Sequence, residues 1–242
     1  NLSNPKSLVY FKNPTWNMIL NSKAENLAYA NTVIASNPGL DGVPDFRWLN
    51  GCSPTAASSI MTYWGVRGHR SLTRANGTFS FIATNNDLAT QMGTDVDGNT
   101  TINNIPTGII NFALNRGYNY NSGNIALNWA NYKEQIDASH PPVVNLIQAT
   151  DYNNGNHSVV GIGYLWDDYG QMMIVNDAWG PSHASHYRVA FGSYDTTLSN
   201  LTTVDPNGTD PGSSNIGFGS RTLSYGSSGN DVAEHSRQDW ML

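Results

Sequence analysis

The spacing of apolar residues changes near the middle of the chain. Upstream of residue 140, apolar residues recur every three or four positions in several windows, which is typical of amphipathic helices. The clearest window is 54–64, where they form one stripe. Downstream of residue 140, short apolar runs alternate with turn sequences such as YNNGN and DDYG, which favours strands. Helices followed by strands indicate an α+β fold with segregated elements.

The pattern predicts helices first and strands later. The helices are expected at 17–36, 54–64, 86–92, 105–118 and 132–140, and the strands at 142–149, 157–166, 171–179 and 186–194. Ser53 is the expected N-cap of the second helix, with Pro54 at its first position. Asn85 or Asn86 is expected to cap the third helix, and Thr107 the fourth. Residues 195–220, rich in Asp, Asn, Gly and Ser, are expected to be loop or linker.

The composition indicates an extracellular protein. Only 12% of the 242 residues are charged, about half the usual share, and Asn, Ser, Thr and Gly supply the polarity instead. The net charge is −6 and no Lys/Arg cluster occurs, which argues against nucleic acid as a partner. No apolar run reaches the roughly 18 residues of a membrane span. The first residues, NLSNPKSLVYF, do not read as a signal peptide, so we expect the mature form of a secreted protein.

Cys52 is the only cysteine in the chain, which excludes an internal disulfide. A lone thiol is either buried and inert or free and reactive, and burial is the commoner state. The reactive interpretation requires a lowered pKa, because the thiolate is the nucleophile and a free thiol titrates near pH 8.5. The helix expected to start at Pro54 would stabilise a thiolate through the positive end of its dipole. A reactive thiol would also need a histidine, held by a third polar group.

His157 is the histidine that the strand pattern brings to a polar partner. It begins one predicted strand, and the next predicted strand ends near Asn176 and Asp177. In an antiparallel pair the start of one strand faces the end of the next, so His157 is expected opposite Asn176 or Asp177. The remaining histidines lie in expected loops, turns or the tail, or near a strand start: His69, His140, His183, His186 and His235.

Three segments together resemble the papain-like cysteine peptidases. GCSPTAASSIMTYWG resembles their nucleophile segment and is closest to the branch related to bacteriocin-leader peptidases, where Gly-Cys-Gly/Ser-Pro-Thr begins the central helix. NHSVVGIGY resembles their histidine strand, and IVNDAWGP resembles the segment with the third catalytic residue. The resemblance extends to secreted bacterial members and covers roughly residues 43–195. It implies a papain-like α+β fold, in which a helical half with the nucleophile on its central helix packs against a twisted antiparallel sheet.

The same resemblance implies the roles of individual residues. Cys52 would be the nucleophile, His157 its base and Asp177 the residue that orients the histidine, with Asn176 as the alternative orienter. Family members usually supply a Gln side chain to the oxyanion hole about six residues before the cysteine, but this chain has Phe46 there. Asn50 is the nearest amide. It is expected either to donate to the oxyanion together with the Cys52 N–H or to serve only as a turn residue.

Two other patterns have a metal-binding alternative. In residues 95–99, Asp and Asn alternate as at the start of a calcium loop, but the misplaced Gly and the missing distal Glu favour a plain Asx-rich turn. His183 and His186 could be combined with Asp177 as a zinc set, although no third strong ligand shares their spacing. We therefore expect neither a metal nor a cofactor.

The expected domain boundaries follow from the pattern and the resemblance. Residues 1–200 would form the peptidase domain, with a helical half at about 1–140 and a sheet half at about 141–200, and 201–242 would be linker and tail. Within the tail, RTLSYGSSGNDV at 221–232 resembles the start of a peptidoglycan-binding repeat, which would make the chain part of a longer, wall-associated protein. The alternative is a Gly/Ser-rich tail that matches by chance.

The expected function is cleavage of peptide bonds by a secreted cysteine peptidase through a thioester acyl-enzyme. Its partner would be a peptide or protein substrate, and we expect a monomer. One alternative is an acyl-transfer enzyme on the same fold, such as a transpeptidase, a deamidase or a transglutaminase-like enzyme, because fold does not fix function. The other is a non-catalytic, wall-associated binding module in which Cys52 is buried.

Overall fold

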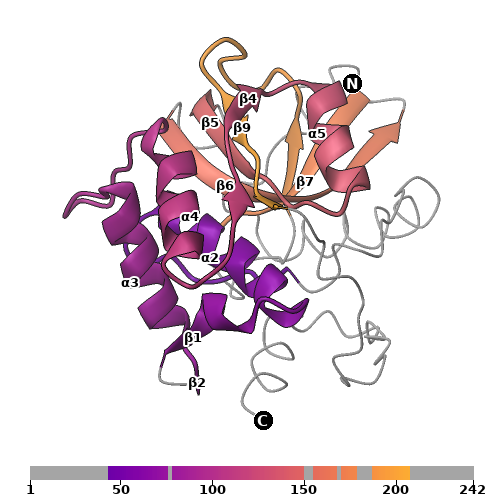
Figure 1. The fold of residues 1–242 in the computed structure, drawn as a ribbon. Helices are drawn as coiled ribbons and strands as arrows, with labels where there is room; N and C mark the ends of the chain where they lie inside the picture. The colour runs from indigo at the N-terminus through magenta and orange to yellow at the C-terminus, as the bar shows by residue number, and fades with distance from the viewer. Residues whose placement is uncertain (1–42, 76–77, 150–154, 168–169, 179–186, 208–242) are drawn as a thin grey trace, which may run out of the picture.

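A computed structural model describes residues 43–75, 78–149, 155–167, 170–178 and 187–207 (Figure 1). Helices and antiparallel strands within these ranges confirm the predicted α+β class. The expected helix at 17–36 and the repeat-like segment at 221–232 lie outside the described residues.

The described helices match four of the predicted ones, and all four predicted strands are present. The helices are α2 (Cys52–Val66), the short 3-10 helix η3 (Arg70–Thr73), α3 (Phe81–Met92), α4 (Asn104–Leu114) and α5 (Trp129–Asp137). The predicted strands are β5 (Val143–Ala149), β6 (Gly155–Asp167), β7 (Gly170–Asn176) and β8 (Tyr187–Ala190). The pattern did not predict β1 (Arg74–Ala75), β2 (Thr78–Phe79), β3 (Tyr120–Asn121), β4 (Asn124–Ala126), β9 (Asn200–Thr202) and β10 (Asp205–Pro206).

The predicted N-cap residues are wrong for three helices. Helix α3 begins five residues early, at Phe81, because the Ser80 hydroxyl caps it by accepting from the Ala83 N–H at 3.2 Å. Asn85 instead lies buried within α3. Helix α4 follows Asn103, so Thr107 lies inside it. Ser53 is likewise the second residue of α2, whose N-cap position is Gly51.

The main sheet has six antiparallel strands in the order β4-β9-β5-β6-β7-β8 (Figure 1). Strand β9 is a correction to the loop expected at 195–220, because it pairs with β5 in the register Val144↔Leu201. Strand β4 comes from the part of the chain expected to be the helical half, and it continues the sheet beyond β9. The sheet therefore takes strands from both sides of the expected boundary at residue 140.

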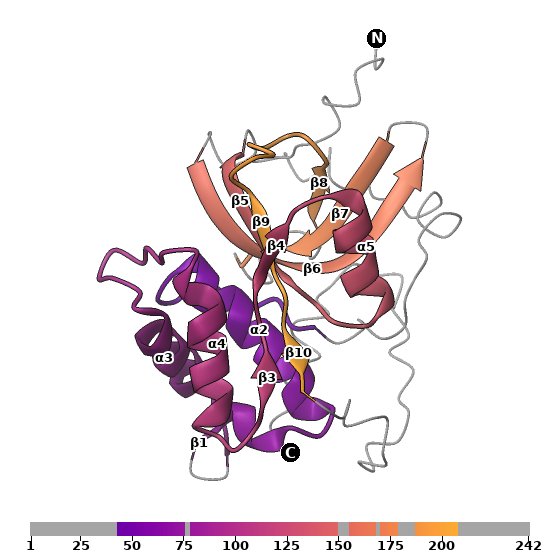
Figure 2. The ribbon, with the colours of Figure 1, turned by 45° about the horizontal axis from the view of Figure 1, so that its top comes forward.

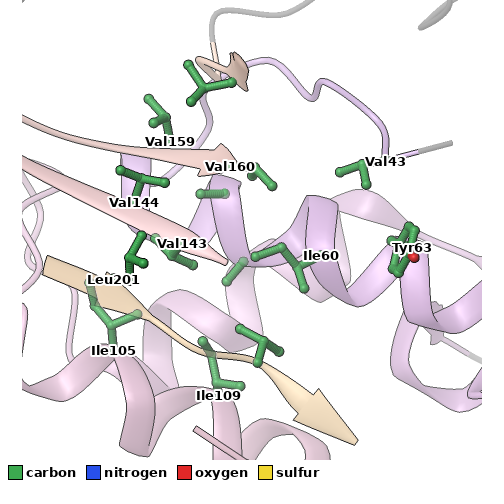
Figure 3. Close-up of a cluster of buried hydrophobic side chains, with 14 of the residues drawn as sticks. Val43, Ile60, Tyr63, Ile105, Ile109, Val143, Val144, Val159, Val160 and Leu201 are labelled. Carbon is green, nitrogen blue, oxygen red and sulfur yellow. The ribbon is translucent and has the colours of Figure 1, made fainter. Parts of the chain in front are cut away.

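Helices α2, α3 and α4 gather beside one part of the sheet, while α5 lies apart from them along β6 and β7 (Figures 1 and 2). The Tyr132 hydroxyl on α5 donates to backbone carbonyls of both strands, at Gly163 (2.7 Å) and Ile174 (2.9 Å). Figure 3 shows the core between the sheet and the helices, where valines of β5 and β6 face Ile60 of α2. Burial of these side chains holds α2 against β6 and so fixes the start of α2 relative to the start of β6.

Gly108→Ala is expected to destabilise the fold by about 1–3 kcal/mol, because a Cβ there would overpack the α3–α4 contact. It would lie 2.4 Å from Cγ of Met92 and 2.9 Å from the Met92 backbone. Urea unfolding would measure the change. Thr107→Ala, on the exposed side of the same helix, is the matched control and should leave the midpoint nearly unchanged. A Gly108→Ala midpoint equal to that of the control would contradict this account of the packing.

Candidate active site

The start of α2 is built around a close backbone approach at Gly51. Gly51 has φ of 141° and ψ of 159°, a conformation that favours glycine, and a Cβ there would lie 2.5 Å from the carbonyl oxygen of Gly98. Among the described residues no side chain caps the helix, and the Gly51 carbonyl accepts the Thr55 N–H at 3.2 Å. Cys52 is the first helical residue and is half-buried. Its thiol therefore lies at the positive end of the α2 dipole.

His157 comes from β6 and reaches the same place. The ring is buried, and its Nε2–H donates to the backbone carbonyl of Asp177 at 2.8 Å. This bond sets the tautomer, so Nδ1 is the nitrogen left for the hydrogen bond with the Cys52 thiol. The antiparallel pairing of β6 with β7 places the chain after Asn176 beside the start of β6, as the strand pattern predicted.

The environment favours a thiolate–imidazolium pair. Burial alone would raise the pKa of the Cys52 thiol, but the hydrogen bond and the charge of His157, and the Ser158 N–H, lower this pKa to about 7. Burial alone would lower the pKa of His157, but Cys52, the carbonyl of Asp177 and the Asp177 charge raise it above its ordinary value. Each group thus stabilises the charged form of the other, which is the condition for a reactive cysteine near neutral pH.

A buried hydrogen-bonded chain supports the pair from the sheet side. Ser53 and Ser158 hydroxyl oxygens lie 2.9 Å apart, and Ser158 donates to Oδ1 of Asn145 at 2.8 Å. Since Ser158 uses its proton on Asn145, the Ser53 hydroxyl donates to Ser158. Asn145 in turn donates to Asn200 (2.8 Å) and Thr202 (3.0 Å) on β9. The unpredicted strand β9 thereby helps to hold the start of β6.

Asp177 and Asn176 occupy different positions relative to His157. The backbone carbonyl of Asp177 makes the contact with the ring, and its buried carboxylate adds a negative charge nearby. Asn176 directs its amide elsewhere, since its Nδ2 donates to the carbonyl of Val43 at 3.1 Å. The structure therefore brings together Cys52, His157 and Asp177.

Asn50 and Phe46 both contact α3. The Asn50 amide donates to Oδ1 of Asn85 at 2.9 Å and to Oδ1 of Asn86 at 2.6 Å. Asn50 would have to break one of these bonds to donate to an oxyanion, so this role stays a prediction. Phe46, at the position of the family Gln, stacks on Phe81 with ring centroids 4.2 Å apart. The donor already in place is the Cys52 backbone N–H at the start of α2.

Asp45 is a buried acid that the sequence reasoning missed. Only 8% of it is exposed, and its Oδ1 has no hydrogen-bond partner among the described residues. Burial and the Asp177 charge raise the pKa of Asp45 to about 8, while the Ala178 N–H acts in the opposite direction. The signal that could have found it is a single acidic residue between apolar neighbours in the segment VPDF.

The turn at residues 95–99 is stabilised by hydrogen bonds to the side chain of Asp95. The Asp95 carboxylate accepts from the backbone N–H groups of Asp97 (3.0 Å) and Asn99 (2.8 Å), as in an Asx turn. Within the part of the chain that the structure describes, no cluster of three or more His, Cys, Asp or Glu side chains could hold a metal ion. His183 and His186 lie outside the described residues.

A thiol at the start of the central helix faces a histidine from an antiparallel sheet, an arrangement that resembles the site of papain-like cysteine peptidases. In a comparison with protein families, the Peptidase_C39 like family matches residues 40–198, more than half of the chain. The chain belongs to this family. No curated protein matches the chain. None of the described helices has the length and apolar character needed to cross a membrane.

Proposed function

We propose that the protein is a secreted cysteine peptidase in which Cys52, His157 and Asp177 form a catalytic triad. The observation that carries the proposal is the contact of a half-buried Cys52 thiol with His157, which lowers the thiol pKa to about 7. The low share of charged residues supports secretion. The run Gly51 to Thr55 supports a place near the branch of bacteriocin-leader peptidases.

The reaction would follow from the geometry of the pair. His157 takes the Cys52 proton at Nδ1, and the sulfur attacks the carbonyl carbon of the scissile peptide bond. The oxyanion that forms accepts from the Cys52 N–H. When the C–N bond breaks, imidazolium gives its proton to the leaving amine and a thioester is left on Cys52. Water then attacks the thioester while His157 takes a proton from it, the C–S bond breaks, and the imidazolium returns the proton to the Cys52 sulfur as the acid product leaves.

Product analysis tests the proposal against acyl transfer. A mixed peptide library is incubated with the protein, with and without an added primary amine, and the masses of the products are measured by mass spectrometry. A peptidase adds water at the cleaved carbonyl in both reactions, so we expect acid products throughout. Amide products that incorporate most of the added amine would instead assign a transferase, which uses the same thioester with another acceptor.

The wall association that the tail suggests needs a separate experiment, because residues 221–232 are its basis. The full chain and a chain ending at residue 207, the last described residue, are sedimented with purified peptidoglycan. Binding by the full chain alone supports wall association. Equal absence of binding by both chains contradicts it and leaves the peptidase proposal untouched.

The pH dependence of kcat/KM is expected to be bell-shaped. The acid limb should have its midpoint at about 7, because Cys52 must lose its proton and its pKa is lowered to that value. Activity should fall again on the alkaline side, as His157 loses the proton that the leaving amine needs, and its raised pKa places this limb above the ordinary value for histidine. A single rise centred near 8.5, the value of a free thiol, would contradict the pairing.

A further inference from the structure

The segment before Cys52 is attached to the turn that follows β7. The Asn176 side chain donates to the Val43 carbonyl at 3.1 Å, and the Trp48 N–H donates to the Ala178 carbonyl at 2.7 Å. Between these two contacts, the Ala178 N–H bonds to the Asp45 carboxyl group. The residues on either side of Asp45 are therefore fixed to this turn by hydrogen bonds.

The turn needs such support because of its backbone conformation. Ala178 has φ of 66°, in the left-handed region, which is strained for a residue other than glycine. The backbone conformation of Ala178 helps to set the direction of the preceding carbonyl, that of Asp177, whose oxygen lies 2.8 Å from Nε2 of His157. A change at Ala178 would thus alter the hydrogen bond that sets the ring of His157.

Asp45 and Asp177 bring two carboxyl groups into one buried place. They are 8% and 2% exposed, and Asp177 is the charged group that acts on Asp45 among the described residues. His157 and Cys52 are the titratable groups on the other side of Asp177. An ionised Asp45 would leave its Oδ1 as a buried acceptor without a donor, next to a like charge. A protonated Asp45 has a donor to offer, and the charge of the neighbouring Asp177 carboxylate favours this neutral form.

We propose that Asp45 is a positioning residue: as a neutral acid it donates a hydrogen bond to the Asp177 carboxylate, accepts the Ala178 N–H, and so holds the carbonyl that orients His157. The inference rests on the proposed function of Cys52 and His157. A neutral Asp45 leaves the charge of the triad unchanged, because the carboxyl groups of Asp45 and Asp177 together carry one negative charge near neutral pH.

The test compares Asp45→Asn with Asp45→Ala, using iodoacetamide labelling of Cys52 as the readout. The asparagine amide can donate to Asp177 and its oxygen can accept from Ala178, so we expect labelling at acidic to neutral pH within about twofold of wild type. Asp45→Ala loses both contacts, and a loosened His157 raises the thiol pKa. One unit of pKa lowers the thiolate fraction about tenfold below the midpoint, so labelling should slow about tenfold. Asp97→Asn and Asp97→Ala, in the exposed 95–99 turn, are the matched controls.

Three outcomes decide the matter. Slow labelling of Asp45→Ala with near wild-type labelling of Asp45→Asn supports the proposal. Equal rates for wild type and Asp45→Ala overturn it. An Asp45→Asn variant about tenfold slower than wild type also overturns it, even if Asp45→Ala does not fold, because the side chain would then act as a carboxylate. Labelling needs no peptide, so failure of the wild type to cleave the library would reject the peptidase and not this role of Asp45.

Discussion

Cys52→Ala is expected to abolish peptide cleavage. The variant removes the atom that would form the thioester, and loss of a nucleophile in a comparable hydrolase costs on the order of 10⁶-fold in kcat. The methyl group of Ala fits where the thiol stands at the first residue of α2, and Ala favours a helix, so the fold should be kept. A loss of activity can then be ascribed to chemistry.

The measurement is hydrolysis of a mixed peptide library, followed by mass spectrometry, with wild type and variant purified in parallel. Thr107→Ala, exposed on α4, is the control for an alanine substitution that should not affect activity. Because the chain has one cysteine, iodoacetamide should add one label to wild type and none to Cys52→Ala. Equal cleavage by wild type and Cys52→Ala would reject the peptidase proposal or reveal a contaminating protease.

The sequence was enough to predict the parts of the site that depend on local structure. The start of α2 at Cys52 is indicated within one or two residues by the order Gly, Cys, Ser, Pro, since proline is favoured in the first turn. The approach of His157 to the end of β7 follows from the alternation of strands and turns, because an antiparallel pair leaves few other registers. Both predictions use neighbours that lie close in the chain.

The hydrogen bond that orients His157 could not be predicted from the sequence. The motif drew attention to the side chains of Asp177 and Asn176, while the structure uses the backbone carbonyl of Asp177. The direction of that carbonyl depends on the left-handed Ala178, and this conformation is held by residues about 130 positions earlier, such as Val43 and Asp45. No local sequence pattern around Ala178 predicts its left-handed conformation, because alanine does not favour positive φ.

Strand β9 was missed for a related reason. It has only three residues, Asn200 to Thr202, and polar neighbours that read as loop. Its strand conformation comes from pairing with β4 and β5 on either side. Burial of Leu201 and the hydrogen bonds from Asn145 to β9 stabilise that pairing. Both interactions involve residues more than fifty positions away in the chain.

His157→Ala is expected to lower kcat/KM on the order of 10⁴-fold or more and to change how the thiol titrates. In the wild type, His157 outweighs burial and brings the pKa of Cys52 to about 7. Without the ring, burial remains and the main opposing influence is gone, so the pKa should rise above the 8.5 of a free thiol. The midpoint of iodoacetamide labelling against pH should therefore move from about 7 to above 8.5.

His69→Ala is the matched control, since this histidine lies after the far end of α2, where it stacks on Tyr118 at 4.4 Å between ring centroids. Its labelling midpoint should equal that of wild type.

The effect of His157→Ala on the labelling rate near neutral pH distinguishes the two interpretations of Cys52, an inert buried thiol and a reactive thiol. In a binding module with an inert, buried thiol, labelling would be slow in the wild type, and removal of His157 would speed it by opening a path to the sulfur. In a peptidase, wild-type labelling is rapid near neutral pH and His157→Ala slows it, because the thiolate there exists only while the imidazolium stands beside it.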